Sequence, residues 1–326
     1  MTNHTLQKRI GWQGDLRLLL RQVCNDYKIG KYADHVLIQT GYEDFNLRLS
    51  TGQGLYFVKI FATSRNLPNC KRIVKIMERA VEAGVQYPKL YKSSQGYLYQ
   101  TVMDSVAIRL CVMQHIGGKD LFQLRAKATK DEARFLIQQA ALINNITLKP
   151  TPLYDSWAIK NILVEYERSK PHLNADDDKL LQPVVKKCAF FDPHKLPHCF
   201  VHGDIIATNV MRSVDGKLYI LDFSASNYYP RIVELAVMFS DLLFDHDDET
   251  SFPKNYDLAL SEYQKYIPLA PNEIAALPLY IQGAHAMHVI RGTYEKVVMK
   301  NSTAENEYHL NMGRIGLRYT SKLWSN

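Results

Sequence analysis

The most informative part of this chain is the stretch CFVHGDIIATNVMRSVDGKLYILDFSAS, residues 199–226. Its apolar opening is typical of a buried strand that delivers Asp204 into a loop. Asn209 follows Asp204 at the fifth position, and the Asp-Gly pair at 215–216 predicts a hairpin turn. The returning strand ends on Asp222, so we expect the hairpin to bring Asp222 back beside Asn209.

These residue types in this order suit phosphoryl transfer. That reaction needs one aspartate to receive a hydroxyl proton, and an asparagine and a second aspartate to hold Mg²⁺. Mg²⁺ is a hard cation that prefers such oxygen ligands. The spacing from Asp204 to Asn209 is that of the catalytic loop H-R-D-x-x-x-x-N in protein kinases. Each part alone is a weak signal, but the order, the spacing and the intervening turn together make coincidence a poor explanation.

The stretch resembles the aminoglycoside phosphotransferase and choline kinase superfamily, whose hallmark is H-G-D-x-x-x-x-N followed by a D-F or D-W strand end. The order of elements is similar over nearly the whole chain, but the resemblance is specific only in 199–235. It implies an α+β, two-lobed protein-kinase-like fold and an ATP- and Mg²⁺-dependent kinase. By this resemblance Asp204 is the catalytic base, Asn209 and Asp222 are metal ligands, and His202 holds the loop.

The first part of the chain predicts a small antiparallel sheet with one main helix packed on it. Alternating apolar and polar residues indicate the strands, and glycines mark the turns between them. The expected strands lie within 36–61, at 97–103 and at 106–116, and the expected main helix lies at 70–83.

Three features of this first lobe are expected to bind the nucleotide. Lys59 in YFVKI is placed like the strand lysine of V-A-I-K in kinases, although an ordinary strand lysine is the alternative. The turn around Gly41 occupies the place of the nucleotide-covering loop but has a single glycine. The backbone of Gln114, His115 and Ile116 is expected to meet the adenine edge, with a plain strand end as the alternative.

Some positions depart from the family pattern. The family usually pairs the strand lysine with a glutamate of the first-lobe helix, and here neither Glu78 nor Glu82 falls clearly at the expected place. Ser224 replaces the usual glycine or aspartate after D-F. Glu234 stands where the family commonly has the aspartate of D-L-A, and a glutamate could still brace the catalytic loop.

The remainder of the chain is predicted to be mostly helical. We expect an N-lobe at 1–113, a hinge at 114–118 and a helical C-lobe at 119–326, with the catalytic loop and the substrate side in the C-lobe. The aspartates at 176–178 lack the spacing of a calcium-binding EF-hand and are interpreted as the solvated start of a helix. The expected helices lie at 131–147, within 163–188 with a break around Pro171, and within 256–324.

The segments 222–245 and 305–317 resemble the homoserine kinase and hydroxylysine kinase branch. This implies a small amino alcohol or hydroxy amino acid as the acceptor, and an aminoglycoside-like compound is a further possibility. A carboxylate of Asp241 or Asp245 could hold a substrate ammonium, with a solvated acidic loop as the alternative. His285 and His288 lack the third ligand that a zinc site needs.

Composition narrows the class of protein. With 46% hydrophobic and 22% charged residues the chain is expected to be globular rather than disordered. The net charge is +7, but the basic residues are scattered along the chain, so no nucleic-acid partner is expected.

The cysteines and the apolar runs bear on the cellular location. The 5 cysteines, an odd number without a C-x-x-C pair, argue against a disulfide framework. No signal peptide and no run of roughly 18 apolar residues is found, so we expect a cytoplasmic protein without a membrane partner. The oligomeric state stays open.

Two rival functions remain to be weighed. A non-catalytic nucleotide-binding or ligand-binding module of the same fold is favoured by the single loop glycine and by the uncertain partner of Lys59. The joint presence of Asp204, Asn209 and Asp222 argues against it. A protein kinase is disfavoured because Gly203 replaces the arginine of H-R-D and no A-P-E segment follows.

Overall fold

The computed structural model describes residues 7–38 and 44–324 of the chain. These form two compact units, Met1–Gly118 and Lys119–Asn326. The expected hinge, 114–118, forms the end of the first unit, and the turn expected around Gly41 lies outside the described residues. Among the helices of the described ranges, none is long and apolar enough to cross a membrane.

The first unit is built on an antiparallel sheet with the strand order β1-β2-β3-β6-β4, and β5 pairs with β6. In β2, alternate residues such as Leu47 and Leu49 are fully buried, so one face of the sheet carries the core. The register places Asn46 opposite Lys59 on β3, and Lys59 opposite Cys111 on β6. The strands are β1 (Tyr32–Ile38), β2 (Phe45–Thr51), β3 (Gly54–Ile60), β4 (Leu90–Tyr91), β5 (Tyr99–Met103) and β6 (Val106–Gln114).

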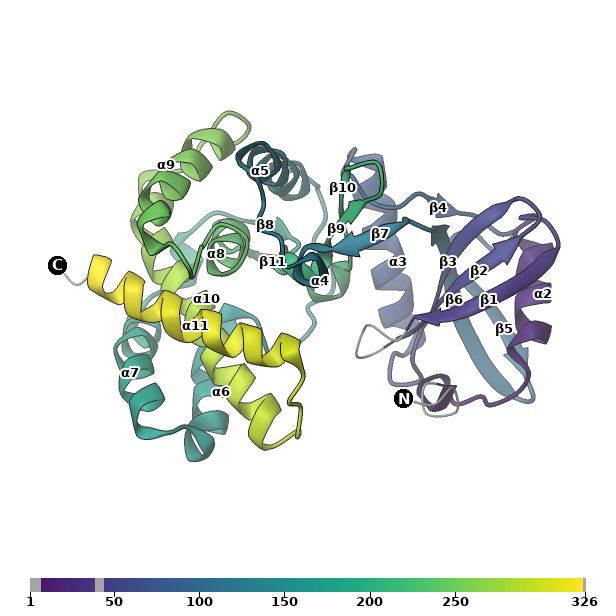
Figure 1. Cartoon of the computed structure of the whole chain (residues 1–326), viewed down its shortest axis with the longest axis horizontal. Coiled ribbons are helices and arrows are strands. Elements are labelled where there is room, and N and C mark those ends of the chain that lie inside the picture. Colours follow the sequence, from purple (N-terminus) through teal and green to yellow (C-terminus); the bar gives the residue numbers. More distant parts are fainter. Residues whose placement is uncertain (1–6, 39–43, 325–326) are drawn as a thin grey trace. The chain divides into compact units, whose positions relative to one another are not determined.

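Two helices lie on opposite sides of this sheet (Figure 1). Helix α2 (Leu16–Asp26) begins after Asp15, whose side chain accepts a hydrogen bond from the N–H of Arg17. Its buried stripe joins the apolar face of the sheet in one core. Helix α3 (Leu67–Glu82), the expected main helix, begins after the capping residue Asn66.

The second unit is mostly helical, with short strands in and around residues 199–226. Strand β8 (His198–Val201) pairs with β11 (Asn227–Pro230). The hairpin of β9 (Val210–Ser213) and β10 (Leu218–Ile220) adds β7 (Gly118–Asp120) to the outer side of β9.

The helices of the second unit pack around α10 (Pro271–Val297), which is buried continuously from residue 280 to residue 293. A helix that is buried all round forms the centre of a bundle. The chain between α6 and α7 breaks at a short turn containing Pro171, as predicted. The other helices are α4 (Leu121–Leu124), α5 (Lys130–Asn144), α6 (Ile162–Ser169), α7 (Ala175–Phe190), α8 (Val233–Ser240), α9 (Phe252–Tyr263) and α11 (Ala304–Leu323).

Candidate active site

The β9–β10 hairpin brings the predicted metal ligands together. Val210 pairs with Ile220, and the N–H of Leu221 donates to the carbonyl of Asn209 at 2.8 Å. Asp222 therefore follows directly after the residue that is bonded to Asn209. The side-chain amide of Asn209 donates in turn to Oδ2 of Asp204 at 2.7 Å. Asp204, Asn209 and Asp222 thus lie around one point of the second unit.

The backbone on both sides of this point has an unusual conformation. Gly203 has φ +77°, a value that L side chains rarely adopt, which explains a glycine before Asp204. Asp222 has φ 56°, although it is not a glycine. Its Oδ1 accepts hydrogen bonds from the N–H of Ser224 at 3.0 Å and from its hydroxyl at 2.5 Å. Such strain costs about 1–3 kcal/mol and is concentrated at functional sites. Ser224 therefore helps to hold Asp222 in place.

Glu234 braces the catalytic loop from α8. Its carboxylate accepts hydrogen bonds from the N–H of His202 at 2.7 Å and of Gly203 at 3.1 Å, and from the side chain of Asn144 at 3.2 Å. The residue is fully buried. Burial raises the pKa of Glu234 to about 7, against the opposing effect of these donors. The longer side chain at this position reaches the loop as the sequence suggested.

His202 connects the loop to the strand that carries Asp222. Its Nε2 lies 3.0 Å from the carbonyl oxygen of Leu221, and its Nδ1 accepts from the N–H of Asp204 at 3.2 Å. Burial lowers the pKa of His202 to about 4, which keeps the ring neutral. A neutral ring with both nitrogens engaged is suited to holding the loop rather than to proton transfer.

Asp204 is half-buried among other acidic groups. Burial, followed by the charges of Asp155 and Asp222, raises the pKa of Asp204 to about 8, while His309 and Asn209 oppose this rise. Carboxylate and amide oxygens gathered in this way fit Mg²⁺, which prefers oxygen ligands and would relieve the repulsion between the carboxylates. Asp155 was not singled out from the sequence, since no motif surrounds it.

Lys59 has its carboxylate partner at Asp44, the residue just before β2. Its Nζ lies 3.2 Å from Oδ2 of Asp44, and the two side chains are only 10% and 3% exposed. Asp44 also accepts from Nε of Arg65 at 2.9 Å. The two glutamates of α3 bind cations of their own helix, Glu78 with Lys75 and Glu82 with Arg79. The only signal for Asp44 in the sequence is an acidic residue just before β2.

The remaining predicted nucleotide contacts lie at the end of β6. The N–H of Gln114 donates to the carbonyl of Lys89 at 2.8 Å, so this amide is already used within the sheet. His115 and Ile116 are half-buried. Burial and the charge of Arg48 lower the pKa of His115. Their contact with adenine stays a prediction.

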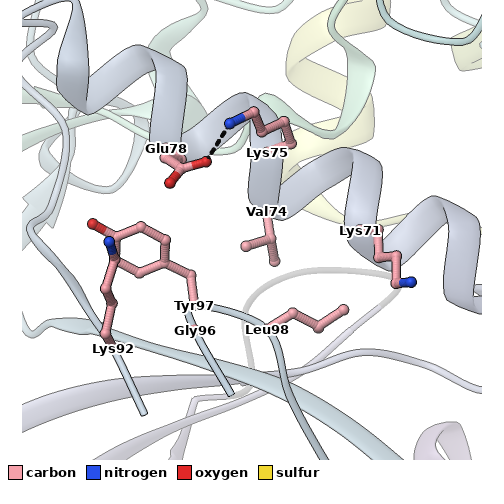
Figure 2. Close-up of a pocket in the computed structure, with 8 residues that line it drawn as sticks. All are labelled: Lys71, Val74, Lys75, Glu78, Lys92, Gly96, Tyr97 and Leu98. Carbon is pink, nitrogen blue, oxygen red and sulfur yellow. Dashed lines mark hydrogen bonds and ion pairs between the residues drawn. The ribbon is translucent and has the colours of Figure 1, made fainter. Parts of the chain in front are cut away.

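A hollow of about 300 Å³ in the first unit lies away from these groups. Figure 2 shows it between α3, which carries Lys75 and Glu78, and the facing segment with Tyr97 and Leu98. Its lining contains neither Lys59 nor the residues at the end of β6. This hollow is therefore not the predicted nucleotide site. The lining residues are Lys71, Val74, Lys75, Glu78, Lys92, Gly96, Tyr97 and Leu98.

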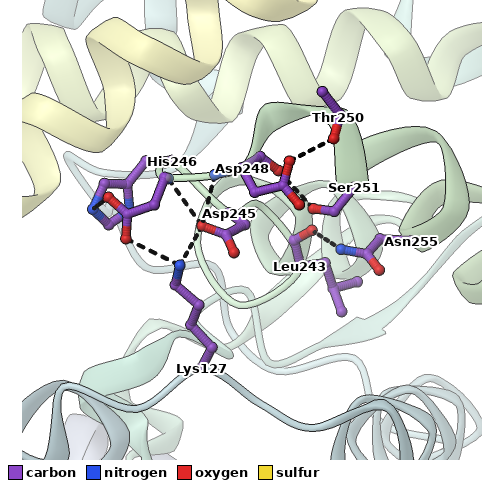
Figure 3. Close-up of polar contacts among 9 residues, drawn as sticks. Lys127, Leu243, Asp245, His246, Asp248, Thr250, Ser251 and Asn255 are labelled. Carbon is purple, nitrogen blue, oxygen red and sulfur yellow. Dashed lines mark hydrogen bonds and ion pairs between the residues drawn. The ribbon is translucent and has the colours of Figure 1, made fainter.

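The two candidate substrate carboxylates have different surroundings. Asp241 is only 3% exposed, and its Oδ1 accepts from the N–H of Ala207 at 2.7 Å, next to the catalytic loop. Asp245 is bound by the ammonium of Lys127 (Figure 3). The same ammonium lies 3.0 Å from Asp247. Asp245, His246 and Asp247 are grouped closely enough to share a cation, but Lys127 already supplies a positive charge there. A substrate role for Asp241 or Asp245 stays a prediction.

Comparisons with known proteins agree with this geometry. The profile of the family described as "Phosphotransferase enzyme family" matches residues 34–269, a span that includes Lys59 and the whole catalytic stretch. The chain belongs to this family. It is a phosphotransferase that acts on small molecules, as the resemblance at 199–235 predicted.

The sequence of the phosphotransferase is similar to those of curated homoserine kinases over most of its length. It is 22% identical over 276 residues to a homoserine kinase of Parvibaculum lavamentivorans, a match that covers 83% of each chain. It is 23% identical over 271 residues to a homoserine kinase of Rhodospirillum rubrum, covering 82% of this chain and 83% of the relative.

Solved structures confirm the predicted kinase-like α+β fold. A microcompartment-associated aminopropanol kinase has a TM-score of 0.67 and 11% identity, covering 95% of this phosphotransferase and 98% of that chain. An amicoumacin kinase, solved in complex with AMP-PNP, Ca²⁺ and Ami, has a TM-score of 0.66 and 14% identity, covering 98% and 96%.

Proposed function

We propose that this phosphotransferase transfers the γ-phosphoryl group of ATP to a hydroxyl of a small amino alcohol or hydroxy amino acid. Homoserine and aminopropanol, on which relatives act by their names, are the first candidates, and an aminoglycoside-like acceptor is a further one. The observation that carries the proposal is the juxtaposition of Asp204, Asn209 and Asp222 on a braced loop and hairpin.

In this mechanism Asp204 accepts the proton of the acceptor hydroxyl. The acceptor oxygen forms a bond to the γ-phosphorus while the bond from that phosphorus to the β,γ-bridging oxygen breaks, and ADP leaves. Asn209 and Asp222 would hold Mg²⁺, which when bound neutralises charge on the phosphates. Lys59, held by Asp44, would contact the phosphates from the first unit.

The raised pKa of Asp204 belongs to the metal-free site. Mg²⁺ bound beside it would lower this pKa, so that the carboxylate is ionised and can accept the proton. Because the transition state of phosphoryl transfer is loose, most of the rate enhancement comes from positioning and charge stabilisation. The bracing of the loop by Glu234 and His202 serves that positioning.

The rival interpretation as a nucleotide-binding module without turnover loses one of its supports. It drew on the missing helix glutamate beside Lys59, and Asp44 provides a buried carboxylate in its place. The single glycine of the loop around Gly41 is the support that remains.

The test is Mg²⁺-dependent release of ADP with homoserine, aminopropanol, choline and an aminoglycoside as acceptors. Asp204→Asn keeps the shape of the side chain and should abolish most of the turnover. Asp192→Asn is the control, because it makes the same substitution at an exposed aspartate of the second unit. The side chain of Asp192 accepts a hydrogen bond from the N–H of His194 at the start of a short turn. Turnover that survives in Asp204→Asn would contradict the assigned base. Absence of Mg²⁺-dependent nucleotide binding would favour the module without turnover.

A further inference from the structure

We propose that the acceptor is recognised through its amine, and that Asp155 and Trp157 form the binding site for that amine. This inference rests on the proposed function, because it concerns the acceptor of the same reaction. It assigns a role to a segment, residues 153–157, that no motif in the sequence marks.

The segment is fastened beside the catalytic loop by Asn227. The side chain of Asn227, which is 1% exposed, accepts from the N–H of Leu153 at 3.3 Å and donates to its carbonyl at 3.0 Å. Asn227 is paired in register with Val201, three positions before Asp204. One buried amide therefore ties the segment to the strands on either side of the catalytic hairpin.

Asp155 is then held in a defined turn two residues further on. Its Oδ1 accepts from the N–H of Trp157 at 2.9 Å, and its carbonyl accepts from the side chain of Asn161 at 2.7 Å. The turn adjoins the catalytic loop through Trp157, whose ring centroid lies 6.2 Å from that of His309. Nδ1 of His309 lies 3.9 Å from Oδ2 of Asp241, and Oδ1 of Asp241 accepts from the N–H of Ala207 in that loop. A carboxylate in this turn favours an acceptor with a positive charge near its hydroxyl.

Trp157 adds an aromatic wall next to buried polar groups. Its side chain is 36% exposed, and its ring centroid lies 6.2 Å from that of His309 and 6.5 Å from that of His288. The two histidines are 7% and 8% exposed. Nδ1 of His288 has no hydrogen-bond partner among the described residues, whereas Nδ1 of His309 lies 3.9 Å from the carboxylate of Asp241. Buried polar atoms without a partner are rare and point to a ligand or ordered water. An indole face is a good partner for an ammonium group.

The opposite arrangement, recognition through an acceptor carboxylate, fits these residues less well. The guanidinium beside Trp157 belongs to Arg291, 5.9 Å from the ring centroid. Its Nη1 binds the fully buried Glu165 at 2.7 Å, and its Nη2 binds Glu295 at 2.7 Å. Arg291 thus already binds two carboxylates through Nη1 and Nη2, and its buried Nε has no hydrogen-bond partner among the described residues.

The experiment compares acceptors that differ in one charged group. Homoserine carries both an amine and a carboxylate, aminopropanol has the amine alone, γ-hydroxybutyrate has the carboxylate alone, and propanediol has neither. We expect homoserine and aminopropanol to be used well and γ-hydroxybutyrate poorly. Equal use of γ-hydroxybutyrate and aminopropanol would overturn amine recognition while leaving the kinase activity intact.

Variants then assign the residues. Asp155→Asn keeps the acceptor oxygen of the turn but removes the charge, and should raise KM for amine-bearing acceptors roughly tenfold, the effect of about 1.4 kcal/mol, with a smaller change in kcat. Trp157→Leu should raise the same KM less. Asp192→Asn, which removes a charge from the same kind of turn, should leave KM unchanged. An equal loss on propanediol would overturn the inference, because Asp155 would then act on the base and not on the amine.

Failure of the two proposals can be told apart. Absence of turnover with every acceptor would contradict the proposed function. Calorimetric binding to the intact chain still decides the inference in that case, because aminopropanol must then bind more tightly than γ-hydroxybutyrate. Equal or absent binding of the two would overturn it.

Discussion

Lys59 in the first unit and Asp204 in the second both have carboxylate neighbours, which attract the lysine and repel the aspartate. In the first unit the carboxylate of Asp44 forms ion pairs with both Lys59 and Arg65. In the second unit Asp204 has Asp155 and Asp222 as acidic neighbours. Cations suit phosphates, and neighbouring carboxylates suit Mg²⁺ and an amine. Under the proposed function, Lys59 of the first unit would serve the anionic donor, and the aspartates of the second unit would serve the cationic partners.

The two centres also differ in how they are held. The second is fastened by a dense set of hydrogen bonds that join the loop at 202–209 to Leu221 and Glu234. The first depends on the register of β2 with β3, which sets Asn46 opposite Lys59 and leaves Asp44 close to it. Changes to single residues should therefore reduce turnover most in the second unit, and affect nucleotide binding and stability most in the first.

The largest effect is expected at the centre of the second unit. Asp204→Asn should lower kcat by about 10²–10⁴-fold, the usual contribution of a positioned base. Asp222→Asn should lower it further, because the metal ligand is lost and charge stabilisation is the larger part of this catalysis. Steady-state kinetics at saturating Mg²⁺ measures both. A smaller loss for Asp222→Asn than for Asp204→Asn would contradict the roles given to the two aspartates.

The second-largest effect is expected in the first unit, at the carboxylate that pairs with Lys59. Asp44→Asn leaves Lys59 and Arg65 buried without their shared charge, which should destabilise the chain by about 3–5 kcal/mol and raise KM for ATP. Urea unfolding and nucleotide kinetics check this. Glu78→Gln is the matched control on α3, and its effect should stay within about 0.5 kcal/mol. An increase of KM for ATP in Glu78→Gln alone would restore the helix glutamate as the partner of Lys59.

The smallest effect concerns pH. The pKa of Glu234 is raised from 4.5 to about 7 in the folded state, so the folded chain binds this proton more tightly than the unfolded chain does. The stability that this proton contributes is complete below the unfolded pKa and is lost as pH rises through the folded pKa. In metal-free buffer, the free energy of unfolding should therefore fall between about pH 5 and about pH 8.

Glu234→Gln tests that assignment, because glutamine does not titrate. The variant should be less stable at every pH, since it places an NH₂ group against backbone N–H donors, but its stability should fall less with pH. A fall as steep as that of the unmodified chain would show that another group, such as Asp204, carries the pH dependence. Urea unfolding at several pH values measures the slope.

Much of the fold could be predicted because its signals are local. Alternating residues in β2 and β3, the Asp-Gly turn before β10 and the break at Pro171 are all set by neighbours within a few positions. The short strands β4 and β7 were not predicted, because two or three residues carry no recognisable period. The aspartates at 176–178 begin a helix as expected, but Asp177 is 2% exposed rather than solvated and binds Arg314 at 2.7 Å.

The sequence by itself determined the catalytic hairpin, because Asp204, Asn209 and Asp222 are joined by a turn whose residue types specify its geometry. It also indicated Lys59 by its place in an alternating strand. Only the tertiary structure decided which carboxylates surround these residues. Asn227 ties the segment that carries Asp155 to the strands beside the catalytic loop, and Asp177 is paired with Arg314 from a helix far along the chain. Local periods and turns encode elements, whereas distant partners are selected by the free energy of packing whole elements together.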